Sequence, residues 1–368
     1  MRIGIVTMPL CSNYGGILQN WALQKVLSNL GHEAITLRFP VMYQNMSDLH
    51  YWISVFPRQL VRYIANKVKG KNQELPITIN IWRDNVKGIE RFIDQHINVT
   101  KYLPSLSMND VKRYGIEALV VGSDQIWRPV MYDALKYYFL GFTENEDILR
   151  IAYAPSIAVK VWPFNEELTP KIRQQIKLFD AISVREESSV KLVKDNLGVD
   201  AQWVLDPTML VNVEEYLTLC IGEPQKLNSF VFAYILDMTE EKQKMLDWLS
   251  KELGCGIVYL TADKIRQGET IEKWLAYFRD ASYVLTDSYH GTVFSLIFHK
   301  QFYCFYNPLR GNARMDSLKK ISGLDNRFIT RSKVTIDDDI DYTDVEKNIK
   351  EMRERSTEFL ERALLSND

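Results

Sequence analysis

Cysteine is scarce in this sequence of 368 residues, and its four copies form no recognisable motif. Cys11, Cys220, Cys255 and Cys304 are widely spaced and include no C-x-x-C pair. This pattern argues against a disulfide framework and favours reduced thiols in a cytoplasmic protein. The sequence also shows no cluster of His, Cys and Asp with the spacing of metal ligands, so we expect no metal site.

Long apolar runs and a strong charge of one sign are absent as well. Nowhere do about 18 uncharged apolar residues follow one another, which is the rough minimum for a membrane-spanning helix. The apolar run at residues 3–8 ends at Pro9 and is too short for the core of a signal peptide. With a formal net charge of −2, we expect no nucleic-acid partner, and local arginines must hold any anionic ligand.

What the sequence contains instead is an alternation of β-rich runs and helical segments. Residues 3–8 and 34–37 are β-rich and flank a helical segment at 17–30, so they predict a β-α-β unit with a right-handed crossover. No G-x-G-x-x-G fingerprint follows the first run. Further β-rich runs lie at residues 118–121, 150–154, 181–184, 230–236, 256–260, 283–286 and 302–306, and further helical segments at 240–253, 270–278 and 292–298.

The length of the chain and a pause in this alternation predict two domains. A chain of this length is too long for one ordinary core. The alternation pauses near residues 203–207 and restarts at 230, so we expect an N-terminal α/β domain at 1–205 and a second at 206–335. The amphipathic end, residues 336–368, predicts a helix that packs back toward the first domain.

One segment departs from this scheme. Residues 51–72 carry five basic side chains and several aromatic ones without an acidic residue. Such a segment could lie on an anionic membrane surface as an amphipathic helix, which would make the protein peripheral at the inner membrane face. It could equally pack on its own domain with its lysines in solvent, as long surface insertions do.

A single histidine stands between a β-rich run and an apolar helical segment. Asp287, Ser288 and Tyr289 lead from residues 283–286 into His290. This order places an imidazole at a helix N-terminus, where unpaired N–H groups and the helix dipole attract anions. Because imidazole can take and give a proton near neutral pH, His290 is our first catalytic candidate. The alternative is that it only caps the helix, and Asp287 could either orient the ring or cap the turn.

Three arginines follow predicted strands and could hold an anion. Arg185 ends the run at 181–184, and Arg310 and Arg314 lie in the loop after 302–306. Ligands gather outside the carboxyl ends of parallel strands, and the planar guanidinium matches phosphate and carboxylate groups. Ordinary surface salt bridges are the competing interpretation.

Asp124 and Trp127 are the candidates from the first half of the chain. Asp124 follows the run at 118–121 and could hydrogen-bond a ligand hydroxyl or act as a base, and Trp127 could offer a flat ring face to a ligand. Asp124 and Ser123 could equally cap a turn.

Four motifs in order resemble those of polysaccharide pyruvyl transferases: residues 13–19 (NYGGILQ), 121–127 (VGSDQIW), 183–186 (SVRE) and 287–292 (DSYHGT). The resemblance extends from residue 1 to about residue 330. It implies two Rossmann-like domains facing a cleft, as in GT-B glycosyltransferases. It also implies phosphoenolpyruvate as the donor, no further cofactor, and a pair of sugar hydroxyls on a lipid-linked or other glycan as the acceptor. The product would be a pyruvate ketal on a precursor of a bacterial surface polysaccharide such as a capsule or exopolysaccharide.

The expected site residues fall into three groups. We expect catalytic roles for His290, Asp124 and Asp287. The donor side would contain Arg185, Ser288, Tyr289, Gly291, Thr292, Arg310 and Arg314. The acceptor side would contain Asn13, Tyr14, Gly15, Gly16, Gln125 and Trp127, with the glycines either admitting a ligand or only shaping a turn.

The sequence departs from the family pattern at one point. Some members have Arg-Leu-His where this chain has Ser288-Tyr289-His290, so only the histidine carries over and another arginine must grip the donor. Two other functions stay open: a GT-B glycosyltransferase that uses a nucleotide sugar, and a non-catalytic paralogue that binds glycans.

Overall fold

The structure is a computed structural model that describes residues 1–10, 13–39, 79–103, 105–129, 135–143, 146–226, 228–261, 269–333 and 335–365. The basic segment 51–72 lies outside the described residues, so its proposed membrane contact stays a prediction. Among the described residues, no helix combines the length and apolarity that crossing a bilayer would require.

The N-terminal domain is built on a six-stranded parallel sheet with the order β2-β1-β3-β4-β5-β6. Its strands are β1 (Arg2–Val6), β2 (Glu33–Thr36), β3 (Ala118–Val121), β4 (Leu149–Ala152), β5 (Ala181–Val184) and β6 (Gln202–Trp203). Its helices are α1 (Tyr14–Asn29), α4 (Ile79–His96), α5 (Met108–Arg113), α6 (Leu135–Tyr138), α7 (Leu168–Ile176) and α8 (Glu187–Leu197), with short 3-10 turns η3 (Gln125–Trp127) and η5 (Gly141–Thr143).

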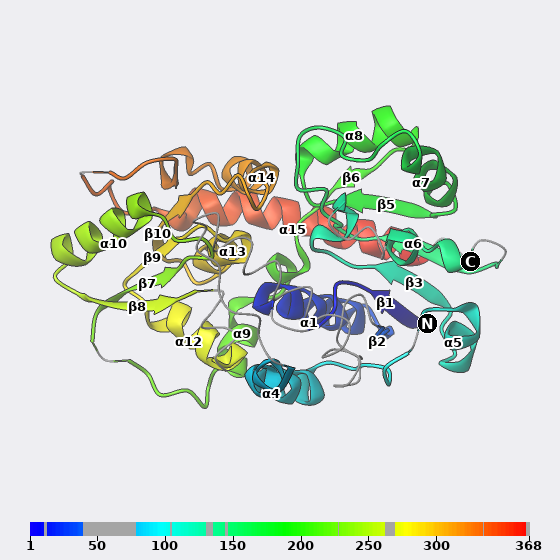
Figure 1. Cartoon of the computed structure of the whole chain (residues 1–368), viewed down its shortest axis with the longest axis horizontal. Coiled ribbons are helices and arrows are strands. Elements are labelled where there is room, and N and C mark those ends of the chain that lie inside the picture. The colour runs from blue at the N-terminus through cyan, green and yellow to red at the C-terminus, as the bar shows by residue number, and fades with distance from the viewer. Residues whose placement is uncertain are drawn as a thin grey trace, which may run out of the picture.

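The C-terminal domain has a five-stranded parallel sheet with the order β11-β10-β9-β7-β8. Its strands are β7 (Phe230–Tyr234), β8 (Gly256–Leu260), β9 (Tyr283–Thr286), β10 (Gln301–Phe305) and β11 (Phe328–Ile329). The helices are α10 (Glu240–Glu252), α12 (Ile271–Asp280), α13 (Tyr289–Ile297) and α14 (Ala313–Ser322), and η7 (Asp325–Arg327) precedes β11. Figure 1 shows the two sheets side by side, one in each half of the molecule.

Both sheets have the same topology when their strands are numbered within each domain. In each sheet the second strand pairs with one side of the first strand, and the third strand pairs with its other side. The later strands then continue outward from the third, which gives the order 2-1-3-4-5, followed by a sixth strand in the N-terminal domain. This is the doubly wound order of Rossmann-like domains, whose ligands bind where the direction of winding changes. That point lies between β1 and β3 in the first domain and between β7 and β9 in the second. The predicted fold class is therefore confirmed.

The central strands are apolar because both of their faces are covered. In β3 the sequence is Ala-Leu-Val-Val, and all four residues are buried. A strand with helices on both faces of its sheet needs a continuous apolar run, whereas a half-exposed strand alternates. This explains why the β-rich runs were visible in the sequence.

The two domains share one apolar core. Tyr14 of α1 packs edge-on against Trp274 of α12, with 5.9 Å between the ring centroids. Trp21, also in α1, contacts Tyr216, which in turn contacts Phe294 of α13. Tyr216 belongs to α9 (Val213–Leu219), which follows η6 (Pro207–Leu210) in the connection between the sheets.

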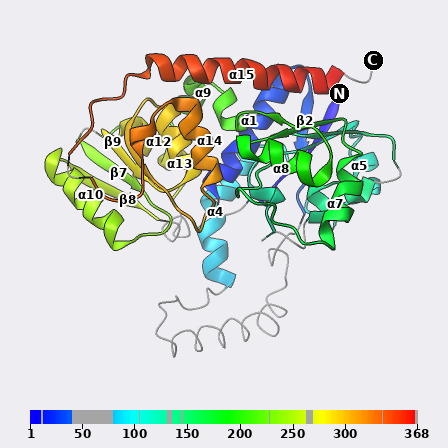
Figure 2. The same cartoon turned by 90° about the horizontal axis from the view of Figure 1, so that it is seen from above.

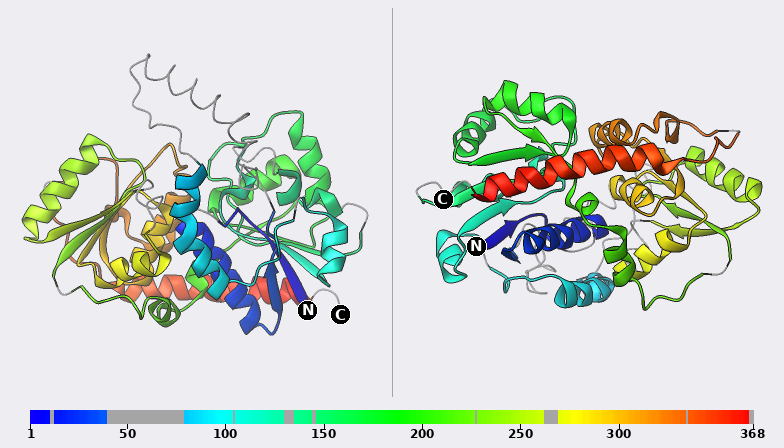
Figure 3. Two further views of the ribbon diagram at one scale, coloured as in Figure 1. Left: turned by 60° about the horizontal axis from the view of Figure 1, so that its bottom comes forward. Right: turned by 180° about the vertical axis from the view of Figure 1, so that it is seen from behind.

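The last helix, α15 (Tyr342–Leu365), lies along both domains, as Figures 2 and 3 show. At its start the Tyr342 hydroxyl donates to the Lys300 carbonyl of the C-terminal domain (2.6 Å). Farther along, Ser356 Oγ accepts from the backbone N–H of Leu205 (2.9 Å). The helix therefore ties the second domain to the end of the first.

Candidate functional site

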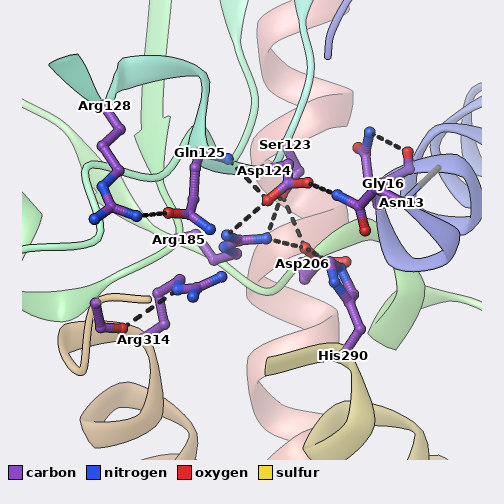
Figure 4. Close-up of polar contacts among 12 residues, drawn as sticks. Asn13, Gly16, Ser123, Asp124, Gln125, Arg128, Arg185, Asp206, His290 and Arg314 are labelled. Atoms are coloured by element: carbon purple, nitrogen blue, oxygen red, sulfur yellow. Dashed lines mark hydrogen bonds and ion pairs between the residues drawn. The ribbon is translucent and has the colours of Figure 1, made fainter. Parts of the chain in front are cut away.

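Side chains that follow the carboxyl ends of strands from both sheets meet at the domain boundary (Figure 4). Asp124 follows β3, Arg185 follows β5, and Asp206 follows β6. His290 comes from the other domain, in the first turn of α13 after β9. Asp124 and His290 thus lie just beyond the two switch points of the doubly wound sheets, where ligands of such folds bind.

Arg185 occupies the centre of this cluster. Its Nη1 donates to Asp206 Oδ2 at 2.7 Å, and its Nη2 lies 3.5 Å from Asp124 Oδ1. The guanidinium carbon lies 4.3 Å from the centre of the Tyr289 ring. Burial alone would lower the pKa of Arg185, but Tyr289 and the carboxylates outweigh it and raise that pKa. Arg185 is therefore a fixed charge that holds the loops of the two domains together.

Asp206 was not predicted, although it is the carboxylate nearest to His290. It receives hydrogen bonds from Ser123 Oγ (2.9 Å), Arg185 Nη1 (2.7 Å) and Thr208 Oγ1 (2.7 Å). Burial would raise the pKa of Asp206, but His290 and Arg185 reverse the effect and lower it far below the usual range. A signal was present in the sequence, because Asp206 precedes Pro207 and caps a helical turn.

The His290 ring lies between Asp206 and Gly15. Its Nε2 is 3.6 Å from Asp206 Oδ2, longer than an ordinary hydrogen bond, and Nε2 has no hydrogen-bond partner among the described atoms. On the other side, a Cβ built on Gly15 would fall 2.0 Å from His290 Nδ1. Gly15 therefore leaves space for the imidazole. This differs from the expectation that the glycine leaves space for a ligand.

Arg314 brings a second guanidinium to Tyr289, at 5.5 Å from its ring centre. Its hydrogen bonds go to the backbone carbonyls of Arg310 (2.6 Å) and Gly311 (3.4 Å). No carboxylate among the described side chains forms an ion pair with it. Burial and the nearby Arg185 charge lower the pKa of Arg314 to about 10. Its positive charge is thus poorly compensated, which an anionic ligand would correct.

Arg128 is a further cation that sequence reasoning missed. Its Nη1 donates to Gln125 Oε1 (2.7 Å), and its Nη2 donates to the Leu309 carbonyl of the C-terminal domain (3.2 Å). Both acceptors are uncharged. Burial and the nearby Arg310 lower the pKa of Arg128. The predicted residue Gln125 therefore supports a guanidinium that points across the domain boundary (Figure 4).

Two predicted residues differ from their expected roles because other partners occupy them. Arg310 forms a two-pronged ion pair with Asp237 (2.7 and 3.0 Å), so its charge is already compensated. Asp287 does not orient the imidazole. Its carboxylate accepts from Lys242 Nζ (2.6 Å), Asn307 Nδ2 (2.9 Å) and two backbone N–H groups inside the C-terminal domain.

Trp127 also differs from expectation, since its ring is buried in the N-terminal core. Its Nε1 donates to the Tyr138 carbonyl (3.1 Å), and its ring stacks on Phe139 at 5.0 Å. A side chain that is 1% exposed offers no face to a sugar. Its large apolar surface explains the burial, which the motif alone did not reveal.

The first loop supports Asp124 and the domain contact. Asn13 Nδ2 donates to Asp124 Oδ2 (2.8 Å), and Gly16 leaves the space for this pair, since a Cβ there would lie 2.7 Å from Asn13 Nδ2. Asp124 also caps η3 through the Gln125 N–H and has a left-handed φ of 76°. Tyr14 is buried, and its hydroxyl donates to the Glu269 carbonyl of the other domain.

The remaining predicted residues build the turn that carries His290. Ser288 caps α13 through the Gly291 N–H (3.3 Å), and the Thr292 hydroxyl donates to the Ser288 carbonyl (3.0 Å). Gly291 packs against Thr286, where a Cβ would meet the hydroxyl at 2.2 Å. These residues position Tyr289 and His290 at the domain boundary.

Solved structures similar to this chain are distant. UDP-GlcNAc 2-epimerase from Neisseria meningitidis, bound to UDP-GlcNAc, aligns over 100% of both chains with 9% identity and a TM-score of 0.49. UDP-N-acetylglucosamine 2-epimerase from Rickettsia bellii aligns over 100% of this chain and 96% of its own, with 10% identity and a TM-score of 0.46. The E. coli heptosyltransferase WaaC with ADP aligns over 96% of this chain and 100% of its own, with 12% identity and a TM-score of 0.39.

Among curated proteins, none matches the sequence significantly. The family model for polysaccharide pyruvyl transferase, in contrast, matches residues 13–308, which include every predicted site residue except Arg310 and Arg314. The match includes strands β2 to β10 and the residues Asp124, Arg185, Asp206 and His290. This chain belongs to the polysaccharide pyruvyl transferase family.

Proposed function

We propose that this protein transfers the enolpyruvyl group of phosphoenolpyruvate to two hydroxyls of one sugar and forms a cyclic pyruvate ketal. The observation that carries the proposal is that an imidazole and two guanidinium groups without carboxylate partners lie at the same domain boundary. His290, Arg314 and Arg128 lie around the same domain boundary, and both arginines contact only uncharged acceptors among the described residues. A small acid that carries both a phosphate and a carboxylate suits such cations.

The chemistry requires one proton to move to carbon and another to leave with the phosphate. The first sugar hydroxyl adds to C2 of the enolpyruvyl group, while C3 gains a proton and becomes a methyl group. The second hydroxyl then replaces the phosphate at C2, and its proton leaves with that phosphate. The sum is a diol plus phosphoenolpyruvate giving a ketal plus inorganic phosphate, with no redox step and no net water.

His290 is the group suited to these proton transfers. It lies at the domain boundary, and imidazole can act as an acid toward C3 or as a base toward a hydroxyl. Arg314 and Arg128 would hold the donor's anionic groups and stabilise the charge that develops on the leaving phosphate. Arg185 would add to this field from a fixed position, because Asp206 and Asp124 already hold it.

The acceptor would contact the N-terminal side of the boundary. Asn13, Asp124 and Gln125 offer amide and carboxylate groups there, and such groups suit sugar hydroxyls. Trp127 is not among these acceptor contacts, because its side chain is buried. We propose that the acceptor is a precursor sugar linked to a lipid or a nucleotide, used on the cytoplasmic side of a bacterial membrane.

The test is an analysis of products with defined probes. The protein is incubated with phosphoenolpyruvate and a panel of methyl hexosides, UDP-hexoses and polyprenyl-diphosphate hexosides. Phosphorus NMR should show inorganic phosphate only when an acceptor is present, and proton NMR should show the new ketal methyl singlet. A glycosidic bond formed from a UDP-hexose alone would instead identify a glycosyltransferase. Glycan binding with no turnover of any donor would identify a binding paralogue.

A further inference from the structure

Asp206 is the most heavily bonded carboxylate of the boundary, and it holds Arg185 in place. Its Oδ1 accepts from the N–H (3.0 Å) and hydroxyl (2.7 Å) of Thr208. Its Oδ2 accepts from Ser123 (2.9 Å) and Arg185 (2.7 Å). Four hydrogen bonds fix both oxygens, so this carboxylate cannot turn without breaking them.

The fixed carboxylate faces a nitrogen that has no other partner. His290 Nε2 lies 3.6 Å from Asp206 Oδ2, is buried, and lacks a hydrogen bond among the described atoms. The opposite nitrogen, Nδ1, lies against Gly15, where no side chain could fit. The ring is thus confined between a backbone on one side and a single carboxylate oxygen on the other.

This contact joins two domains. Asp206 follows β6 and is held by Ser123 and Arg185 of the N-terminal sheet, whereas His290 opens α13 of the C-terminal domain. Because the two groups belong to different domains, the docking of the domains sets the distance between the imidazole and this carboxylate.

We infer that Asp206 is the positioning residue of His290: its fixed Oδ2 faces Nε2 across the domain boundary, attracts the ring when it carries a proton, and thereby favours one orientation of the imidazole. Asp206 acts through His290 and Arg185 and does not itself touch the donor. The consequence for turnover rests on the proposed function, whereas the effect on the imidazole does not. A carboxylate that orients a histidine and fixes its tautomer is a common arrangement in proton-transfer sites.

The test compares Asp206→Asn with the wild-type protein by two independent readouts. The chain has only five histidines, so selective ¹⁵N labelling gives few imidazole signals, and His290→Gln assigns the relevant one. Asp206→Asn should shift the His290 signals toward a different tautomer and leave the other histidines unchanged. Turnover should fall about a hundredfold, with KM for phosphoenolpyruvate changed by less than about threefold. Glu187→Gln is the matched control, because it weakens a different interdomain contact, the ion pair with Lys320.

Ser123→Ala covers the case in which Asp206→Asn does not fold. It removes one hydrogen bond from Oδ2 and keeps the carboxylate, so the His290 signals should shift in the same direction but less. Unchanged His290 signals in every folded variant would overturn the inference. If the wild-type protein forms no ketal, the proposed function fails, and the ¹⁵N signals still decide the role of Asp206.

Discussion

The imidazole of His290 lies so close to Gly15 that a Cβ on this glycine would fall 2.0 Å from Nδ1. Gly15 is in the first turn of α1 and His290 is in the first turn of α13, so two helix N-termini from different domains meet here. Cβ atoms in proteins essentially never lie closer than 3.0 Å to a heavy atom of a residue that is not adjacent in the chain. A side chain at residue 15 must therefore displace the imidazole or move one domain.

Gly15→Ala should consequently reduce turnover by about ten- to a hundredfold, since a shift of about 1 Å at a proton-transfer group is enough for such a loss. The His290 signals in a ¹⁵N spectrum should shift as well, because either response changes the surroundings of the imidazole. Gly222→Ala is the matched control, because a Cβ at residue 222 meets nothing within 4 Å. Full activity of Gly15→Ala would show that the imidazole can move without consequence.

His290→Ala should lower turnover by about two to four powers of ten and leave the melting temperature nearly unchanged. Among the described atoms the imidazole makes no hydrogen bond, and its ion-pair neighbour Asp206 Oδ2 lies 3.6 Å away, so the substitution breaks no hydrogen bond in this part of the chain. His299→Ala is the control, because His299 lies beyond the C-terminal end of α13, and its half-exposed side chain pairs with Glu346. Ketal formation at the wild-type rate in His290→Ala would remove this residue from the mechanism.

The fold could be predicted from the sequence to a large extent because buried parallel strands are continuous apolar runs. The runs at residues 118–121 and 283–286 coincide with the fully buried strands β3 and β9. Those at 181–184 and 256–260 coincide with β5 and β8, which are only partly buried but are also rich in β-branched and aromatic residues. The two-residue strands β6 and β11 were not predicted, since a run that short has no periodicity. Helix α13 begins three residues earlier than expected, and His290 is therefore inside its first turn.

The site could be predicted only in part, because contacts between domains leave no local pattern. His290 and Arg185 were found from their positions after strands. Asp206 lies 84 positions from His290 in the sequence, and only the docking of two sheets reveals that they are neighbours. Trp127 was misplaced for a different reason: its burial depends on packing within the N-terminal domain, against Phe139.

Arg314→Met should weaken phosphoenolpyruvate binding at least tenfold and at the same time stabilise the free protein. The guanidinium is buried beside Arg185 without an ion-pair partner among the described side chains, and this lowers its pKa to about 10. Replacing an uncompensated buried charge by an apolar side chain of similar size removes a desolvation cost. Calorimetry with phosphoenolpyruvate and thermal unfolding without it would check both effects.

Arg310→Met is the comparison for that experiment, since Asp237 already compensates the charge of Arg310. Its loss should affect phosphoenolpyruvate binding less than the loss of Arg314. Equal losses of phosphoenolpyruvate affinity in the two variants, or a lower melting temperature for Arg314→Met, would contradict this assignment of the anion site.

Lys242→Met should destabilise the C-terminal domain by about 3–5 kcal/mol, because it leaves Asp287 buried without its cation. The Lys242 ammonium lies 2.6 Å from Asp287 Oδ2, and both side chains are almost completely buried. Urea unfolding measures the change. Lys191→Met is the control, since its ion pair with Asp195 is largely exposed and should contribute at most about 1 kcal/mol. Similar losses of unfolding free energy in the two variants would mean that the buried Lys242–Asp287 pair contributes no more to stability than an exposed ion pair.

The stability of the protein should depend on Asp206 most strongly in acid. His290 and Arg185 hold the pKa of this carboxyl far below its usual value of about 3.9 in an unfolded chain. A carboxyl with a lowered folded pKa stabilises the native state fully above the unfolded pKa, and this contribution is lost as the pH falls below it. Between about pH 5 and pH 3, the urea midpoint of the wild-type protein should therefore fall more steeply than that of Asp206→Asn. Asp200→Asn, at an exposed carboxylate, should follow the wild-type curve. Parallel curves for wild type and Asp206→Asn would show that the carboxylate is not held in its charged form by the two cations.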